Sequence, residues 1–516
     1  MKSGMAFRSQ FVLVLVAGLC MVMLLLQVPT PAQSIFASIV GTVTDASAAV
    51  VPNAKVTATN VNTNEKREFQ TNQFGNYEIN NLFPGVYSVE VEAPGFGKQR
   101  KDGIKLSSQD ITREDFALAV SAEVTQVTVF AEAAARIETD SGKLSNVRTL
   151  RQIQTLPLIG GVSPRGIWRL LIITPGMSQD GTISGSRANQ TDMTLDGVSL
   201  TAGGAGSSLD FIESVEEIKV DFGNNSAEFK ALGTMTVSSK RGTNELHGAL
   251  YDNYVTGAFR ASNYFTGQKS GVPTHFFGTS AGGPVYLPKL YDGRNRTFWF
   301  LSYEAPFGPQ SVNTFTPTVP LTSWKNGNFS GETTVIKDPL NDGLPFTNNI
   351  IPPGRISNVA KQYLNFWPAP NFGDSTVFTS SNYRAQKLGP FYKQHNGSVR
   401  VDHQISRANT IFARYHHHRN HAPYWESNLP GTLGQEDILR KIRSAIVSDT
   451  HIFSPTLINE FRFGLAFDSI PWYNNMVNGP AFIKAAGLLN VTRDGTIPNV
   501  RQIPVISFSQ GAGIQG

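Results

Sequence analysis

The stretch EFRFGLAFD, residues 460–468, alternates strictly between two kinds of side chain. Large apolar residues stand at 461, 463, 465 and 467, and charged or small residues stand between them. This period of two is that of a β-strand, whose successive side chains point to opposite faces. About nine to eleven such residues can cross a membrane, with the apolar face toward lipid and the polar face toward a lumen. The pattern predicts a transmembrane β-strand. A half-buried strand of a soluble β-sandwich has the same period and is the alternative.

The residues before this stretch extend the prediction. Positions 442–452 also alternate, which predicts a second strand with Arg443, Asp449 and His451 on its wet face. Ser454-Pro455-Thr456 predicts a tight turn between the two strands. Long stretches rich in Pro, Asn and Gly, around 305–395 and 420–435, are candidates for extracellular loops.

The N-terminus has the layout of an export signal. Lys2 and Arg8 precede an apolar run over 11–26, and small and helix-breaking residues follow at 29–33. We expect a cleaved signal peptide over 1–33, because the run is shorter than the roughly 18 to 20 residues of a spanning helix. An uncleaved anchor is the alternative. Cys20 is the only cysteine, so the mature chain would have no disulfide, thiolate metal site or cysteine nucleophile.

Length and composition exclude several classes of protein. Only 16% of the 516 residues are charged, against a usual fraction of about 25%, which disfavours a coiled coil or a charge-driven disordered chain. A net charge of +5 is too small and too dispersed for a nucleic-acid-binding protein. The residues after 244 hold only about seven candidate strands, too few to close a barrel of some 22 strands. We therefore expect a C-terminally truncated fragment of a longer protein.

Short strands with turn residues at their ends fill 34–120. Alternation begins at Ser38, and Gly and Pro mark the corners, which predicts a small Greek-key β-sandwich. The segment resembles the carboxypeptidase regulatory-like domain, a transthyretin-like accessory module, without the His and Glu residues of a zinc peptidase. Tyr77 and Tyr87 could stack on a sugar, although buried core rings are the more common role. The matching motifs are Gly41-x-Val43-x-Asp45, Pro52-x-Ala54-x-Val56, Gly75-x-Tyr77, Leu82-x-Pro84-Gly85-x-Tyr87-x-Val89 and Gly95-Phe96.

Residues 121–244 combine helix and strand patterns. Leu150, Ile153 and Leu156 suit one helix face, and 194–198 predicts a strand with an Asp-Gly turn, so a mixed α/β domain is expected. The motif residues are Arg187, Asn189, Asp192, Asp196 and Gly197, within Gly185-x-Arg187-x-Asn189-Gln190-x-Asp192-x-x-Leu195-Asp196-Gly197-Val198. On these motifs the segment resembles the plug domain of TonB-dependent receptors, except that Ile159-Gly160 stands where the family usually has Asn-Gly after Leu-Pro-Leu.

A β-branched run over 123–131 is similar to the TonB box, the segment by which such receptors engage the energy-transducing protein TonB. An isolated strand with unpaired amides can add to the sheet edge of a partner. The candidate contacts are Val124, Thr125, Val127, Thr128 and Val129. A connecting strand of the plug is an equal alternative.

The remainder, 245–516, resembles the Oar-like branch of these receptors and is expected to be an incomplete outer-membrane β-barrel. The matching stretches, in order along the chain, are 243–248, 282–285, 296–300, 327–330, 350–356 and 400–404.

Two patterns that suggest catalysis or metal binding are explained more simply as parts of ordinary strands. Gly278-x-Ser280-x-Gly282 fits a nucleophile elbow, but an aromatic strand pattern surrounds it. His416-His417-His418 with His421 could hold a metal, but on a strand His417 points away from its neighbours. We therefore predict no enzyme, no cofactor and no metal.

The predicted fold is mainly β: a sandwich, a mixed α/β plug and the N-terminal part of a large antiparallel transmembrane barrel. The resemblance implies an exported outer-membrane receptor or transporter that takes up a ligand such as a carbohydrate or peptide. Its expected partners are TonB, outer-membrane lipid and an unknown ligand, with no nucleic acid. A surface adhesin or carbohydrate-binding protein without transport is the alternative.

Overall fold

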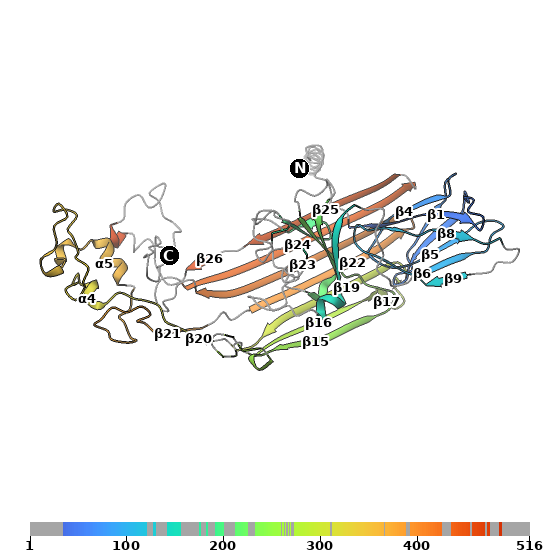
Figure 1. Cartoon of the computed structure of the whole chain (residues 1–516). Helices are drawn as coiled ribbons and strands as arrows, with labels where there is room; N and C mark the ends of the chain where they lie inside the picture. The colour runs from blue at the N-terminus through green and yellow to red at the C-terminus, as the bar shows by residue number, and fades with distance from the viewer. Residues whose placement is uncertain are drawn as a thin grey trace, which may run out of the picture.

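The computed structural model is mainly β and falls into three connected parts, a sandwich, a plug and a wall of long strands (Figure 1). It describes residues 35–120, 127–130, 142–155, 175–176, 182–183, 191–200, 212–224, 233–259, 261–262, 264, 267, 269, 273–309, 312–365, 367–388, 393–425, 435–454, 457–469, 472–474 and 484–487. The expected signal peptide lies outside these residues. Among the described residues no α-helix is both long and apolar enough to cross a bilayer.

The sandwich packs two sheets around one apolar core. One sheet has the order β4-β1-β7, with β8 also paired to β1, and the other has the order β3-β2-β5-β6-β9. Val43, Val56, Tyr77, Val89 and Phe116 are among the buried residues that the two sheets share. The strands are β1 (Ala37–Asp45), β2 (Lys55–Asn60), β3 (Lys66–Gln70), β4 (Asn76–Leu82), β5 (Gly85–Glu92), β6 (Gln99–Leu106), β7 (Ile111–Arg113), β8 (Phe116–Leu118) and β9 (Val127–Phe130).

The plug is a mixed sheet with the order β10-β13-β14-β11-β12. Only β11 and β14 run parallel, and the other pairs are antiparallel. The predicted helix is present as α2, and it buries Ile153 against the sheet with Leu150 beside it, as its apolar spacing requires. The elements are β10 (Leu144–Thr149), α2 (Leu150–Thr155), β11 (Thr191–Leu195), β12 (Val198–Ser199), η1 (Ile212–Ser214), β13 (Val215–Gly223) and β14 (Gly233–Ser239).

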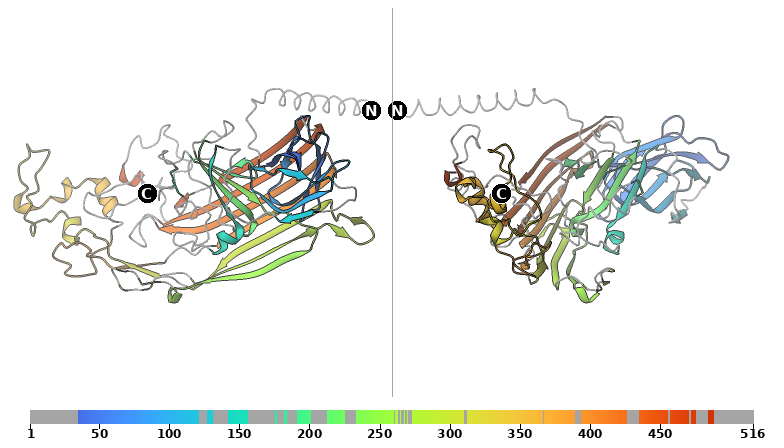
Figure 2. Two further views of the ribbon diagram at one scale, coloured as in Figure 1. Left: turned by 45° about the vertical axis from the view of Figure 1, so that its right-hand side comes forward. Right: turned by 60° about the vertical axis from the view of Figure 1, so that its left-hand side comes forward.

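The wall is a curved antiparallel sheet with the order β15-β16-β19-β22-β23-β24-β25, and β26 pairs with the end of β24. The sandwich lies at one end of these strands and the segment with α4 and α5 near the other (Figures 1 and 2). The wall strands are β15 (His247–Val255), β16 (Thr274–Pro284), β19 (Thr297–Phe307), β22 (Lys393–Ser406), β23 (Asn409–Trp425), β24 (Gln435–Ser454), β25 (Leu457–Ser469) and β26 (Trp472–Asn474). The smaller elements are η2 (Gly257–Phe259), β17 (Tyr286–Leu287), β18 (Tyr291–Asp292), β20 (Val312–Phe315), α4 (Thr322–Lys325), η3 (Thr347–Asn349), η4 (Pro353–Arg355), α5 (Asn358–Leu364) and β21 (Ala385–Leu388).

The apolar side chains of β25 lie on the outer face of the wall, as the alternation predicts. Phe461, Phe463, Leu465 and Phe467 each expose 54 to 58% of their surface. Ser454 pairs with Leu457, so β24 and β25 form a hairpin, while Pro455 and Thr456 of the predicted turn lie outside the described residues. The β25 strand thus contributes apolar side chains that are suited to contact with lipid.

Two predictions about β23 and β24 are wrong. Arg443 and Asp449 pair with Phe467 and Phe461, so they lie on the outer face with the phenylalanines and not on the wet face, and His451 follows the same alternation. The inner face carries serines and Ile446 instead, because Ile446 packs there into an apolar cluster with Phe412. The expected loop at 420–435 is shorter than predicted, since β23 continues to Trp425.

Candidate functional site

A two-residue turn of the plug presents a buried carboxylate to the wall. Asp196 and Gly197 join β11 to β12 with φ of 52° and 83°, a turn that favours Asp-Gly because both residues adopt left-handed backbone conformations. The Asp196 carboxylate is fully buried. It accepts hydrogen bonds from the Ser239 N–H at 2.9 Å and the Ser239 hydroxyl at 2.8 Å. The turn is therefore bound to β14 as well as to its own hairpin.

Two arginines of the wall hold the same carboxylate. Arg400 of β22 and Arg414 of β23 stand directly opposite each other in the strand register. Arg400 Nη1 lies 3.3 Å from Asp196 Oδ1, and Arg414 Nε lies 2.6 Å from Asp196 Oδ2. Arg414 also donates to the Leu195 carbonyl at 3.2 Å. Both guanidinium groups are buried, and the plug supplies a negative charge that offsets the cost of burying them.

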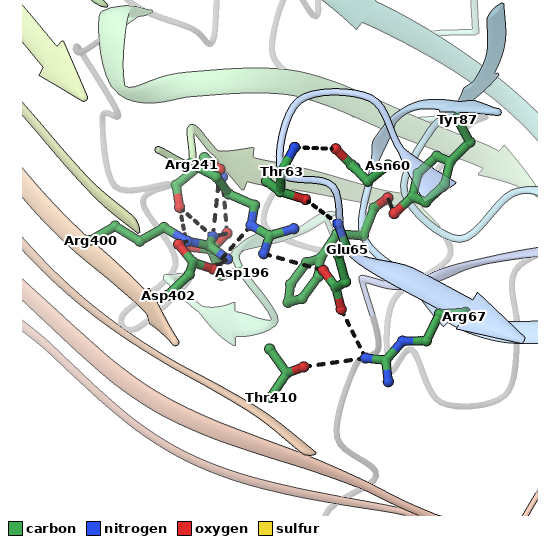
Figure 3. Close-up of polar contacts among 12 residues, drawn as sticks. Asn60, Thr63, Glu65, Arg67, Tyr87, Asp196, Arg241, Arg400, Asp402 and Thr410 are labelled. Atoms are coloured by element: carbon green, nitrogen blue, oxygen red, sulfur yellow. Dashed lines mark hydrogen bonds and ion pairs between the residues drawn. The ribbon is translucent and has the colours of Figure 1, made fainter. Parts of the chain in front are cut away.

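The ion pairs continue from the wall into the sandwich. Asp402 lies 2.9 Å from Arg400 and 3.0 Å from Arg241, which stands two residues after β14. Glu65 of the sandwich lies 3.9 Å from Arg241 and 2.9 Å from Arg67. We call this series the charge chain, and Figure 3 shows most of its members. Its members, in spatial order and alternating in sign, are Arg67, Glu65, Arg241, Asp402, Arg400, Asp196 and Arg414.

Aromatic rings cover the middle of the charge chain. The Arg241 guanidinium lies 3.7 Å from the ring centre of Phe83, and that of Arg400 lies 4.2 Å from Phe412. Phe83 also contacts Phe412 and Phe36 edge to face. Because rings exclude water and attract cations through their faces, they strengthen the adjoining ion pairs. The sandwich, the plug and the wall thus share one buried polar and aromatic junction.

A second set of contacts joins the sandwich to the plug. Ser108 donates its N–H to Glu217 at 2.5 Å, and its hydroxyl lies 2.5 Å from that of Ser238. Lys219, almost fully buried, lies 2.6 Å from Asp110. Burial raises the pKa of Glu217 above its usual 4.5, although the hydrogen bond from Ser108 opposes the shift. The two domains therefore meet through buried polar groups.

The structure places part of the predicted plug motif at this junction. Asp196 and Gly197 form its central turn, and Asp192 accepts a hydrogen bond from Ser199 across the same hairpin at 2.7 Å. Arg187 and Asn189 lie outside the described residues. The wall arginines were not among the predicted site residues. Arg400 lies in the matched stretch 400–404, whereas Arg414 lies in none of the stretches matched from the sequence.

The candidate TonB strand is paired and not isolated. Val127, Thr128 and Val129 belong to β9, which runs parallel to β6 from Gln99 onward and is the outermost strand of that sheet in the described chain. Val124 and Thr125 lie outside the described residues. One edge of β9 is therefore already occupied by the sandwich.

Neither tyrosine proposed for sugar stacking presents a ring to solvent. Tyr77 and Tyr87 are both buried in the sandwich core. Their hydroxyls donate to the carbonyls of Glu114 at 2.5 Å and Phe83 at 2.9 Å. Burial raises the pKa of both phenols. Sugar stacking by these two rings is thus a wrong prediction.

The nucleophile-elbow pattern and the histidine pattern both lie in ordinary wall strands. Ser280 lies within β16, where no strand-to-helix turn exists. His416 and His418 point inward and are buried, whereas His417 points outward, as the period of two predicts. In the described part of the chain, no three His, Cys, Asp or Glu side chains are grouped closely enough to hold a metal ion.

Comparisons with known proteins give matches over most of the chain. Residues 238–516 match the family model described as outer membrane beta barrel domain, and residues 38–119 match the carboxypeptidase regulatory-like domain. The TonB-dependent transporter Oar of Myxococcus xanthus is 27% identical over 288 residues, which are 52% of this chain and 26% of that protein. The chain thus spans about a quarter of this relative's length.

Two solved receptor structures are also similar. The siderophore receptor PirA of Acinetobacter baumannii has 13% identity and a TM-score of 0.37, over 63% of this chain and 40% of the receptor. The ferric enterobactin receptor PfeA of Pseudomonas aeruginosa, a mutant with enterobactin bound, has 9% identity and a TM-score of 0.37, over 65% of this chain and 42% of the receptor.

Proposed function

Because this chain belongs to the outer membrane beta barrel domain family and so resides in the outer membrane, we propose that it is part of a TonB-dependent transporter. In this proposal residues 1–33 are the signal peptide, 34–120 the sandwich, 121–244 the plug and 245–516 part of the barrel. The cargo is an unidentified ligand such as a carbohydrate or peptide. The relative that shares 27% identity is named a transporter, not an enzyme.

One observation carries the proposal: the plug is held to the inner face of the wall by ion pairs at Asp196. Apolar packing would be enough to hold a domain that only blocked the lumen. Such packing is spread over many side chains, so no single contact would release the domain. A buried carboxylate between two arginines is stable only when paired, because each buried charge loses its hydration. The turn therefore has two favourable states, seated or fully withdrawn into water.

The mechanism follows from these contacts. A ligand binds on the side of the wall away from the sandwich, TonB engages the segment at 123–131, and the pull withdraws the Asp196 turn from Arg400 and Arg414. Water then reaches the two guanidinium groups and compensates their charge. The withdrawn plug leaves a polar path along the inner face, which carries Ser302, Ser398 and Ser444.

Deletion of residues 123–131 from the full-length protein tests the TonB contact. We expect the deletion to abolish TonB-dependent uptake while ligand binding at the cell surface persists. A deletion also removes β9 from the sandwich, so a second variant should retain the strand and replace Val124 and Thr125, which precede it, by proline. Uptake that survives both changes would contradict the TonB contact.

A surface adhesin is the second candidate function. The segment between β20 and β21 supports it, since Leu340, Val377 and Phe378 are exposed there. An adhesin would bind its target equally in cells with and without TonB, and no solute would accumulate. TonB-dependent accumulation in the same cells would exclude this function.

A further inference from the structure

The sandwich is bound to a turn of the wall by a cluster of asparagines. Asn64 donates its side-chain amide to Asn295 at 2.9 Å, and Asn244 donates to the same oxygen at 2.7 Å. The Asn244 N–H donates to the Asn62 carbonyl at 3.0 Å. Asn64 and Asn295 have φ of 57° and 60°, a conformation that asparagine tolerates better than most residues. We call Asn62, Asn64, Asn244 and Asn295 the asparagine clasp.

A second wall turn is bound by a buried arginine. Arg67 of the sandwich donates to the Arg407 carbonyl at 2.7 Å and to the Thr410 hydroxyl at 3.2 Å. Arg407 lies in the turn between β22 and β23, and Thr410 begins the inner face of β23. Arg67 is only 6% exposed, so the sandwich covers Thr410. The sandwich thus forms hydrogen bonds with the wall at two separate turns.

The seam between sandwich and plug is of a different kind. Ser108, Lys219 and Ser238 are all buried there, with exposures of 0, 1 and 3%. The asparagine clasp, in contrast, is formed by exposed side chains. Water competes for hydrogen bonds at exposed groups far more effectively than at buried ones. The asparagine clasp is therefore the part of the sandwich–wall contact that water loosens most easily, whereas Arg67 and the Phe83–Phe412 contact form its buried part.

We propose that the sandwich is a releasable bolt, which travels with the plug and holds it in the wall through the asparagine clasp and Arg67. The inference rests on the proposed function, in that the plug has to move. The bolt must leave the turns at Asn295 and Arg407 before the Asp196 turn can withdraw. The charge chain couples the two events. When Glu65 departs, Arg241 loses one of its two carboxylates and keeps Asp402. Arg241 then competes more strongly with Arg400 for Asp402, which weakens the Asp402–Arg400 ion pair.

Thiol labelling of the full-length protein in isolated outer membranes tests the bolt. Cys20 is the only cysteine of these 516 residues and lies in the segment expected to be removed, so single cysteines can be introduced here after any cysteine elsewhere in the full-length protein is replaced by serine. Thr410→Cys reports whether the sandwich has left the wall, and Ser238→Cys reports whether it has left the plug. A water-soluble maleimide is the probe.

Opening the clasp should expose one cysteine and not the other. Asn64→Gly with Asn295→Gly removes the clasp side chains while keeping the backbone conformation accessible. We expect this change to raise the labelling rate of Thr410→Cys at least fivefold and leave Ser238→Cys unchanged. Arg113→Ala, an exposed arginine that pairs with Asp115 on the sandwich, is the matched control. The bolt is refuted if Thr410→Cys stays protected, or if Ser238→Cys is labelled as readily.

A second labelling experiment tests the proposed transport function separately from the bolt. In cells with TonB we expect faster labelling of Thr410→Cys than in cells without it. Linking Asn64→Cys to Asn295→Cys with a short bis-methanethiosulfonate should abolish this difference, and a reducing agent should restore it. Equal labelling with and without TonB would contradict the proposed function, while the clasp result alone decides the bolt.

Discussion

Asp196 is the residue on which the junction depends most. Its carboxylate is shared by two arginines and by Ser239, and all of these groups are buried. Removing one partner of a buried ion pair lowers the free energy of unfolding by more than the intact pair contributes to it, because the remaining charge stays buried without a partner or water. Arg400 has a second carboxylate in Asp402, whereas among the described residues Arg414 forms an ion pair with Asp196 alone. Loss of Asp196 should therefore affect Arg414 most.

Asp196→Asn should destabilise the seated plug by about 3–5 kcal/mol, the usual cost of an uncompensated buried charge. Hydrogen exchange of the β11 amides at increasing urea concentrations measures this free energy. Asp292→Asn is the control, because Asp292 pairs with Arg294 at the surface, where the hydrogen bonds from Arg294 hold its pKa at about 2. The control should leave the stability of the seated plug unchanged, because water screens an ion pair at the surface. Equal effects would contradict a special role for Asp196.

Glu217 should make the sandwich–plug seam depend on pH. Burial raises its pKa above 4.5, so the folded protein binds a proton more tightly than the unfolded chain. This contribution to stability is complete below pH 4.5 and is lost as the pH rises through the raised pKa. Calorimetry between pH 4 and 8 should show a decline that Glu217→Gln removes. An unchanged decline in the variant would assign the pH dependence to other groups.

Single elements were predictable where local chemistry determines them. The Asp-Gly hairpin, the apolar face of α2 and the outward phenylalanines of β25 all follow from short patterns in the sequence. The inner face of β24 was predicted wrongly, because its Ile446 packs on residues more than 300 positions away in the sandwich. The opposition of Arg400 and Arg414 depends on strand register, which alternation alone does not determine.

Gly41 sets the geometry of the first sandwich strand. A Cβ at this position would lie 2.0 Å from the Glu114 carbonyl oxygen and 2.8 Å from the Tyr77 ring. Since backbone cannot yield easily, Gly41→Ala should destabilise the sandwich by about 1–3 kcal/mol. Gly331→Ala, where nothing lies within 4 Å, should stay within about 0.5 kcal/mol. Thermal unfolding of both variants compares them, and similar melting temperatures would refute the close approach.

At the scale of the whole molecule, the outer face of the wall should be in contact with lipid. Phe463 pairs with Val447 between the charged positions of Asp449 and Arg443, so it lies near the middle of that face. Phe463→Arg should cost about 2–4 kcal/mol on insertion, and Phe453→Arg, next to the turn, about 0–1 kcal/mol. Urea titration of the full-length protein in phospholipid vesicles measures both. A cost at Phe453 as large as at Phe463 would contradict this depth assignment.

All three parts of the molecule meet at the charge chain, where the plug turn at Asp196 is seated and from which it can be withdrawn. Gly464 of β25 would carry a Cβ only 3.5 Å from that of Val198 in β12, a spacing suited to a disulfide. The most direct test is therefore the rate of disulfide formation by Val198→Cys with Gly464→Cys under mild oxidation, in cells with and without TonB. We predict rapid, nearly complete bonding in cells without TonB and slower bonding in cells with it. No disulfide in either strain, or equal rates in both, would contradict the account.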